Sequence, residues 1–220
     1  MTAAPLGAEP NRAPPPAVPP PAVSPPPSVA GLTVPAADRR APVWPGLIPP
    51  APGAGSPDPL WWWVGAHGGA GVSTLTAVLT ASADARRAWP GGYPGECPNV
   101  VLVARTHTEG LERARDLATQ YATGLVPPGV RLLGLVTIPD AAGRLPISLR
   151  RQRDLVSATV PAAWHLPWVE PWRSTRRGEL PSWDPEHDPA PAGRRRAHAG
   201  VPAGYLDCGK ELAAAGLAGL

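Results

Sequence analysis

Proline is distributed very unevenly along this chain, and its distribution limits where a folded core can form. The chain has 34 prolines, and Pro and Ala dominate residues 1–58, where large apolar side chains are scarce. Such a segment buries too little apolar surface to offset the entropy that it loses on ordering. We therefore expect residues 1–58 to be a long disordered Pro/Ala-rich arm that samples extended polyproline conformations.

A second biased stretch, residues 174–202, is rich in Arg, Pro, Asp and His, which predicts a linker. Residues 203–220 carry a weak helical pattern interrupted by glycines, which predicts a C-terminal helix-like segment. Residues 59–173 remain for the folded part, which is enough for one small domain.

Within residues 59–173, apolar runs typical of buried strands alternate with helix-like segments. The runs are residues 60–64, 99–104, 131–138 and 163–169, and helices are expected after residue 71, from Thr106 and from Pro146. Thr106 and Glu109 have the spacing of a capping box, and Pro suits a first helical turn. This order predicts an α/β fold with a small parallel sheet flanked by helices. We expect the last run at a sheet edge, because Pro167 cannot donate a ladder hydrogen bond.

A glycine-rich stretch joins the first apolar run to the first helix, with the sequence His67-Gly68-Gly69-Ala70-Gly71-Val72-Ser73-Thr74. In that position, glycines allow backbone N–H groups to surround a phosphate, usually together with a Lys that reaches the outer phosphates. Val72 stands where this Lys is expected, and the only Lys of the chain is Lys210. The stretch therefore has the layout of a phosphate-binding loop without its cation. The alternative is a tight turn that only joins a strand to a closely packed helix.

The same stretch resembles the deviant Walker A loop of the ParA/MinD ATPases, K-G-G-x-G-K-[ST]-[ST], with His67 and Val72 at its two Lys positions. The chain also resembles an actinobacterial group of Pro- and Arg-rich proteins with this degenerate loop. The resemblance implies a reduced P-loop NTPase-like fold. It also implies that three glycines shape the loop, that Ser73 contacts Mg²⁺ and that Thr74 begins the helix; the glycines are Gly68, Gly69 and Gly71.

A missing charged contact to phosphate costs on the order of 2–4 kcal/mol in binding or rate. We therefore expect at most weak binding of ATP and Mg²⁺, no catalytic residue, and a regulatory or scaffolding role with a protein partner in the cytoplasm. The resemblance implies a setting such as plasmid partition, mobile-element maintenance or positioning of cell machinery. Auxiliary residues of the site would be His67, Arg105, Asp140 and Arg144.

Two other functions stay open. In the first, the protein is a slow ATPase in which an arginine, such as Arg105 or Arg144, replaces the missing Lys. In the second, it is a DNA-binding accessory that acts through two arginine clusters, Arg173–Arg177 and Arg194–Arg196. Both clusters also suit a solvated linker.

The composition argues against a membrane span and a disulfide framework. Residues 60–83 carry no formal charge, but Gly, Ala, Ser, Thr and Trp dominate them, and these residues insert poorly into lipid. Cys97 and Cys208 are isolated thiols without metal-ligand spacing, which favours a reducing cytoplasm. No secretory signal is recognisable at the N-terminus.

Overall fold

The computed structural model describes residues 33–49, 59–187 and 200–218. Its centre is a parallel sheet of five strands in the order β2-β1-β3-β4-β5, which confirms the predicted α/β class. The strands are β1 (Trp61–Gly65), β2 (Ser82–Asp84), β3 (Asn99–Arg105), β4 (Arg131–Ile138) and β5 (Ala163–His165). As predicted, β5 is an edge strand, whereas the other edge, β2, was not expected from the sequence.

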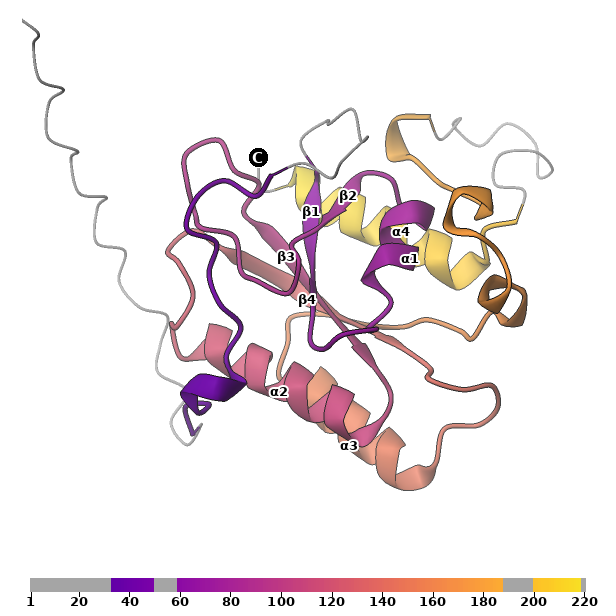
Figure 1. Ribbon diagram of the computed structural model, residues 1–220, viewed down its shortest axis with the longest axis horizontal. Coiled ribbons are helices and arrows are strands. Elements are labelled where there is room, and N and C mark those ends of the chain that lie inside the picture. The colour runs from indigo at the N-terminus through magenta and orange to yellow at the C-terminus, as the bar shows by residue number, and fades with distance from the viewer. Residues whose placement is uncertain (1–32, 50–58, 188–199, 219–220) are drawn as a thin grey trace, which may run out of the picture.

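Helices cover both faces of the sheet (Figure 1). α1 (Val72–Val78) and α4 (Ala203–Leu217) lie on one face, and α2 (Thr108–Ala122) and α3 (Ile147–Ser157) lie side by side on the other. In the described part of the chain, no helix has the length and apolarity needed to cross a membrane.

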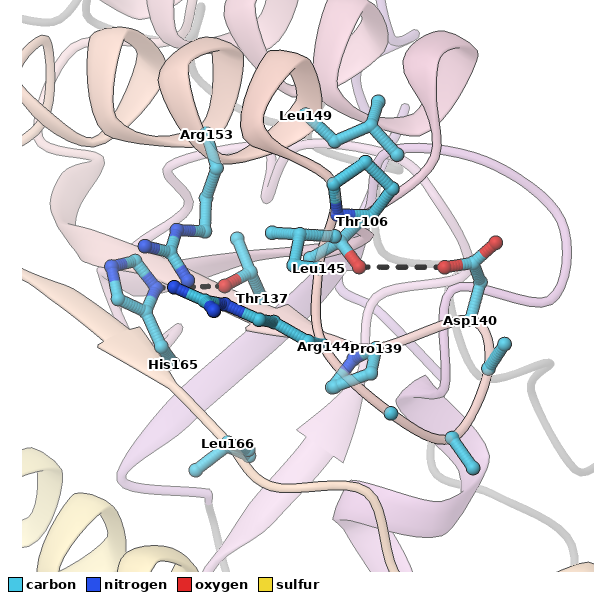
Figure 2. Close-up of a pocket in the computed structure, with 14 residues that line it drawn as sticks. Thr106, Thr137, Pro139, Asp140, Arg144, Leu145, Leu149, Arg153, His165 and Leu166 are labelled. Carbon is cyan, nitrogen blue, oxygen red and sulfur yellow. Dashed lines mark hydrogen bonds between the residues drawn. The ribbon is translucent and has the colours of Figure 1, made fainter.

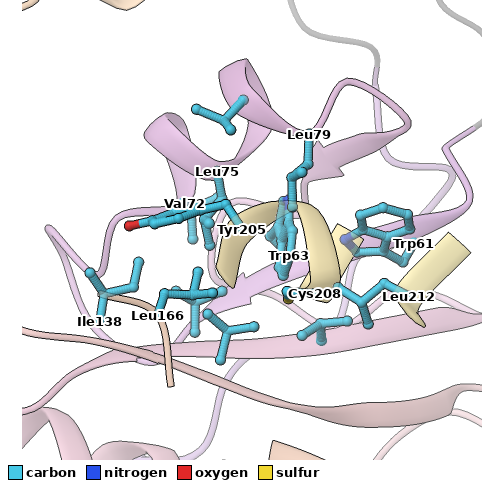
Figure 3. Close-up of a cluster of buried hydrophobic side chains, with 14 of the residues drawn as sticks. Trp61, Trp63, Val72, Leu75, Leu79, Ile138, Leu166, Tyr205, Cys208 and Leu212 are labelled. Carbon is cyan, nitrogen blue, oxygen red and sulfur yellow. The ribbon is translucent and has the colours of Figure 1, made fainter. Parts of the chain in front are cut away.

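The sheet has an apolar core on each face, and three consecutive tryptophans of β1 contribute to both. Trp61 and Trp63 are fully buried and pack with α1 and α4, against Leu75 and Leu212 among others (Figure 3). Trp62 points to the opposite face, because successive strand residues alternate between faces. The Nε1 of Trp63 donates to the Ser82 hydroxyl at 2.6 Å, which ties β1 to β2. The tryptophans are therefore core residues, as their alternation predicts.

Residues 33–49 differ from the expected disordered arm, because they pack on the face that carries α2. Ile48 is buried, the Nε1 of Trp44 donates to the carbonyl oxygen of Ala85 at 2.9 Å, and the backbone N–H of Ala41 donates to the Gln120 side chain at 2.9 Å. No helix forms in the connection from β2 to β3, so this segment covers the sheet there. A few well-placed apolar residues thus suffice to order a proline-rich stretch. The rest of the expected arm, residues 1–32 and 50–58, lies outside the described residues.

The first part of the expected linker is also packed. Trp183 is 3% exposed, and its backbone N–H donates to the carbonyl oxygen of Val78 at 2.7 Å. Its carbonyl oxygen accepts from the N–H of Thr80 at 3.1 Å, so residues 174–187 are fastened to the end of α1. The Arg194–Arg196 cluster lies outside the described residues.

The strand order places a crevice between β1 and β3. The chain leaves β1 toward β2 on one side of the sheet and later continues from β3 toward β4 on the other side. Ligands of doubly wound sheets bind beyond the carboxyl ends of the strands at such a switch point, and the order 2-1-3-4-5 is also that of flavodoxin-like sheets. The glycine-rich loop and the end of β3 meet there.

Candidate functional site

Two cavities open at the carboxyl edge of the sheet. The loop cavity, of about 470 Å³, is lined by residues 65, 67–74, 84, 86, 87 and 105. The β4 cavity, of about 340 Å³, is lined by residues 106, 137, 139–146, 149, 153, 165 and 166. The loops after β1, β3 and β4 thus lie at one edge of the sheet and divide between two cavities.

The glycine-rich loop depends on glycine at two of its positions. Gly69 and Gly71 have φ angles of 78° and 104°, in the left-handed region that other residues rarely adopt. A Cβ on Gly71 would also lie 2.8 Å from the Cδ1 of Ile138. Gly68, by contrast, has open space where its Cβ would be. The loop conformation therefore requires Gly69 and Gly71 and leaves position 68 free to vary.

The residue at the position of the missing Lys belongs to the core. The Val72 side chain is 9% exposed and packs in the apolar cluster that also holds Leu75 and Tyr205 (Figure 3). Ser73 is exposed and lines the loop cavity. Thr74 lines the cavity too, but α1 already begins at Val72, two residues before the start that the resemblance implies.

His67 joins the glycine-rich loop to the end of β3. Its Nε2 accepts a hydrogen bond from the backbone N–H of Arg105 at 3.1 Å, and its Nδ1 lies 2.8 Å from the carbonyl oxygen of Gly68. These two bonds require a neutral ring with its proton on Nδ1. Burial, with smaller contributions from His107 and Arg105, lowers the pKa of His67. His67 therefore holds the loop in place and brings no positive charge to it.

His107 begins α2, which corrects the expected capping box. Its Nδ1 accepts from the backbone N–H of Gly110 at 3.0 Å, so His107 and not Thr106 is the N-cap. Thr106 instead extends the pairing of β3 with β4 by one residue, since its backbone N–H donates to the carbonyl oxygen of Ile138. The rings of His67 and His107 are 4.7 Å apart between centroids.

Arg105 lies directly beneath the glycine-rich loop. Its Nε donates to the carbonyl oxygen of Gly69 at 3.4 Å and its Nη1 donates to that of Pro139. Its Nη2 is 3.7 Å from the position that a Cβ on Gly71 would take. Burial lowers the pKa of Arg105, but a guanidinium stays protonated in proteins. A fixed positive charge thus stands at the loop, on a strand that the sequence correctly predicts.

Sequence reasoning missed two further arginines, Arg86 and Arg87, which line the loop cavity from the end of β2. Both have left-handed φ angles, 54° and 64°. The Arg86 guanidinium lies over the Trp44 ring, 5.8 Å from its centroid, in cation–π geometry. Asp84 also lines this cavity, and its Oδ1 accepts from the backbone N–H of Arg86 at 2.7 Å. Recognising the short strand before them would have identified these residues.

The other predicted site residues lie elsewhere. Asp140 and Arg144 line the β4 cavity and not the loop cavity, and Asp140 lies 3.5 Å from the hydroxyl of Thr106. Among the described residues, the one cluster with metal-ligand spacing is Asp184, Glu186 and His187, which line neither cavity. In the Arg173–Arg177 cluster, Arg173 pairs with Glu170 at 3.2 Å, and Arg176 and Arg177 are exposed.

Comparison with known proteins gives a family and no function. Residues 59–182 match the model of a family described as "Family of unknown function (DUF6668)". Curated proteins and solved structures gave no significant match. The matched residues include all five strands, α1 to α3 and the lining of both cavities, and they end one residue before Trp183. Because the match covers more than half of the 220 residues, the chain belongs to the DUF6668 family.

Proposed function

We propose that the loop cavity weakly binds the phosphate groups of a nucleotide, and that this domain uses the binding to regulate or scaffold a protein partner without efficient hydrolysis. The observation that carries the proposal is the position of Arg105 beneath the glycine-rich loop, where it supplies charge that the loop itself lacks. The proposal includes the ParA/MinD-like relation and the cytoplasmic location that the sequence suggests.

The cavity has the size and the donors that a phosphate group needs. Its volume of about 470 Å³ lies in the range of roughly 300–1,000 Å³ that is usual for small-molecule sites. Within the described residues, the backbone N–H groups of Gly68 and Gly69 donate to no other residue. Arg86, Arg87 and Arg105 line the cavity, and guanidinium groups match phosphate oxygens. Because the Nε and Nη1 of Arg105 already donate to carbonyl oxygens, Arg105 would reach a phosphate with its Nη2.

The same cavity is poorly equipped for hydrolysis. Asp84 is its only carboxylate among the described residues, and it already accepts a hydrogen bond from Arg86. With Ser73 it would offer Mg²⁺ two protein ligands. Val72 replaces the Lys that stabilises charge during phosphoryl transfer, and its side chain is committed to the core. Binding is therefore better supported than turnover.

The position of Arg105 also favours one alternative, a slow ATPase in which this guanidinium replaces the Lys. Arg144 does not support that alternative, because it lines the β4 cavity. Arginine groups can stabilise the transition state of phosphoryl transfer. The two functions differ in whether phosphate is released from bound ATP.

Calorimetric titration with ATP and Mg²⁺ tests the proposal. Gly68→Glu would place a negative charge at the loop, at a position where an added Cβ meets no atom within 4 Å, and Gly68→Ala is the matched control. We expect wild type and Gly68→Ala to bind ATP alike, and Gly68→Glu to bind at least about tenfold more weakly, which corresponds to about 1.4 kcal/mol.

Two results would contradict this binding function: no ATP binding by the wild-type protein, or equal binding by Gly68→Glu. Phosphate release should be measured on the same proteins. Turnover by wild type that Gly68→Glu abolishes would instead establish the ATPase alternative.

A further inference from the structure

We propose that the β4 cavity is a separate site for a small zwitterionic molecule, of the size of a dipeptide, whose carboxylate binds Arg144 and Arg153 and whose ammonium group binds Asp140. The cavity lies beyond the carboxyl ends of β4 and β5, beside the start of α3 (Figure 2). Ligands of parallel sheets bind at such edges.

Positive charge gathers at one end of this cavity. The side chains of Arg144, Arg153 and His165 extend toward the same region around Thr137 (Figure 2). Within the described residues, Arg144 makes no hydrogen bond or ion pair. Arg153 pairs with Asp154 at 2.7 Å, and Asp154 does not line the cavity. The Nε and Nη2 of Arg153 both donate to the Oδ1 of Asp154, at 3.0 and 2.7 Å, so Arg153 offers its Nη1 to a ligand. Arg144 offers its whole forked set of donors, which a ligand carboxylate would match.

Two neutral polar side chains, Thr137 and His165, line the same end of the β4 cavity as the arginines. The Thr137 hydroxyl lies 2.8 Å from the Nδ1 of His165, and Thr137 is fully buried. Burial and the nearby charge of Arg153 lower the pKa of His165, which favours its neutral form. The hydroxyl and the imidazole therefore form hydrogen bonds without adding charge, and the two arginines decide the sign of the ligand group.

Negative charge lies at the other end. Asp140 is separated from His165 and Arg153 by Leu145 and Pro139 in Figure 2. Among the described residues it accepts one hydrogen bond, from the Thr106 hydroxyl at 3.5 Å, and its charge also acts on Arg105. A carboxylate in the same cavity disfavours a dianion such as phosphate and favours a ligand with an ammonium group.

Apolar side chains form the walls between the charged ends, namely Leu145, Leu149 and Leu166. The volume of about 340 Å³ is at the lower end of the range for ligand sites. A short molecule with an apolar middle and opposite charges at its ends fits this arrangement. Arg105, which lines the loop cavity, donates to the carbonyl oxygen of Pro139, which lines the β4 cavity, so the two cavities are neighbours. They share no lining residue, and the argument for this site does not use nucleotide binding in the loop cavity.

The experiment uses the full chain and the dipeptide Gly-Leu as probe, followed by amide NMR shifts and calorimetry. We expect saturable shifts at Thr137 and Arg144, and at least about fivefold weaker binding by Arg144→Ala. Arg144 is exposed and makes no hydrogen bond or ion pair with the described residues, and Arg151→Ala, an exposed arginine of α3 outside both cavities, is the matched control. Asp140→Asn should weaken binding of Gly-Leu but not of N-acetyl-Gly-Leu, which lacks the ammonium group.

Three results would overturn the proposal. The first is no saturable binding of Gly-Leu, and the second is equal binding by wild type and Arg144→Ala. The third is inorganic phosphate that binds the β4 cavity as tightly as Gly-Leu and displaces it, which would make the cavity a general anion site. ATP should not displace Gly-Leu if the two cavities are separate.

Discussion

The Nε2 of His67 accepts a hydrogen bond from the backbone N–H of Arg105 at 3.1 Å, and the Arg105 side chain donates to the carbonyl oxygen of Gly69. Two hydrogen bonds thus join the glycine-rich loop to the end of β3, and Arg105 is the donor in both. The first bond needs a neutral imidazole, because a protonated ring has no acceptor nitrogen. The shape of the loop cavity therefore depends on the protonation state of His67.

The free energy of unfolding should fall as the pH drops below about 6.5, the ordinary pKa of histidine. The folded state lowers the pKa of His67, so between the lowered and the ordinary value the unfolded chain binds more protons than the folded one. Stability contributed by the neutral ring is complete above the ordinary pKa and is lost as the pH falls toward the lowered one. Urea denaturation between about pH 7 and about pH 5 measures this slope.

His67→Gln should make that decline shallower, because an amide can accept from Arg105 and donate to Gly68 but does not titrate in this range. Some slope should remain, since burial also lowers the pKa of His165. The control is Thr119→Ala, which removes an exposed hydroxyl of α2 and no titratable group, so the slope should stay unchanged. An identical slope for wild type and His67→Gln would contradict the role assigned to this ring.

Gly110→Ala should destabilise the fold by about 1–3 kcal/mol, the usual range for overpacking a filled site. An added Cβ would lie 2.5 Å from the carbonyl oxygen of Arg105 and 2.9 Å from the Nε2 of His67. The matched control is Gly178→Ala, where no atom lies within 4 Å and the expected change is within about 0.5 kcal/mol. Equal urea midpoints for the two variants would contradict close packing of the first turn of α2 against His67 and His107.

The sequence predicts the centre of this fold well and its borders poorly, for identifiable reasons. β1, β3 and β4 are buried on both faces, so their runs of apolar residues identify them within one residue. β2 consists of Ser82, Ala83 and Asp84, none of which is β-branched or aromatic, so no local pattern indicates a strand. Missing β2 also meant missing the two arginines that follow it in the loop cavity.

The sequence likewise predicts some residues of the loop cavity and not others. The loop after β1 and Arg105 were expected at one edge, because carboxyl ends of parallel strands meet there. The sequence indicates His67 only as an auxiliary residue of the site, because the partner of its ring is a backbone N–H from a distant strand, which no sequence pattern reveals. Composition assigns residues 33–49 to a disordered arm and Trp183 to a linker. Composition alone does not reveal how a single tryptophan or isoleucine packs against the domain.

Gln120→Ala should release residues 33–49 from the domain before the domain itself unfolds. Gln120 is 2% exposed, and its side chain exchanges two hydrogen bonds with the backbone of Ala41, at 2.9 and 3.0 Å. Losing them leaves partly buried backbone groups of Ala41 unpaired, at about 1 kcal/mol, and local opening follows the weakest contacts. Limited proteolysis should therefore cut within residues 33–49 faster than in wild type. Thr119→Ala, whose hydroxyl bonds only within α2, should be cut at the wild-type rate; equal rates for all three proteins would contradict this anchoring role.

Trp183→Ala should destabilise the fold by about 3–5 kcal/mol, the range for truncating a buried Trp. Its ring packs with Leu79 and lies so close to α4 that a Cβ on Gly209 would be 2.8 Å away. Trp183→Phe should lose less than half as much, because the buried Nε1 of Trp183 has no hydrogen-bond partner among the described residues and its removal abolishes an unpaired donor. Thermal and urea unfolding of the two variants separate ring packing from hydrogen bonding. If Trp183→Ala unfolds like wild type, residues 174–187 are only a linker, as their composition suggests, and α4 docks without them.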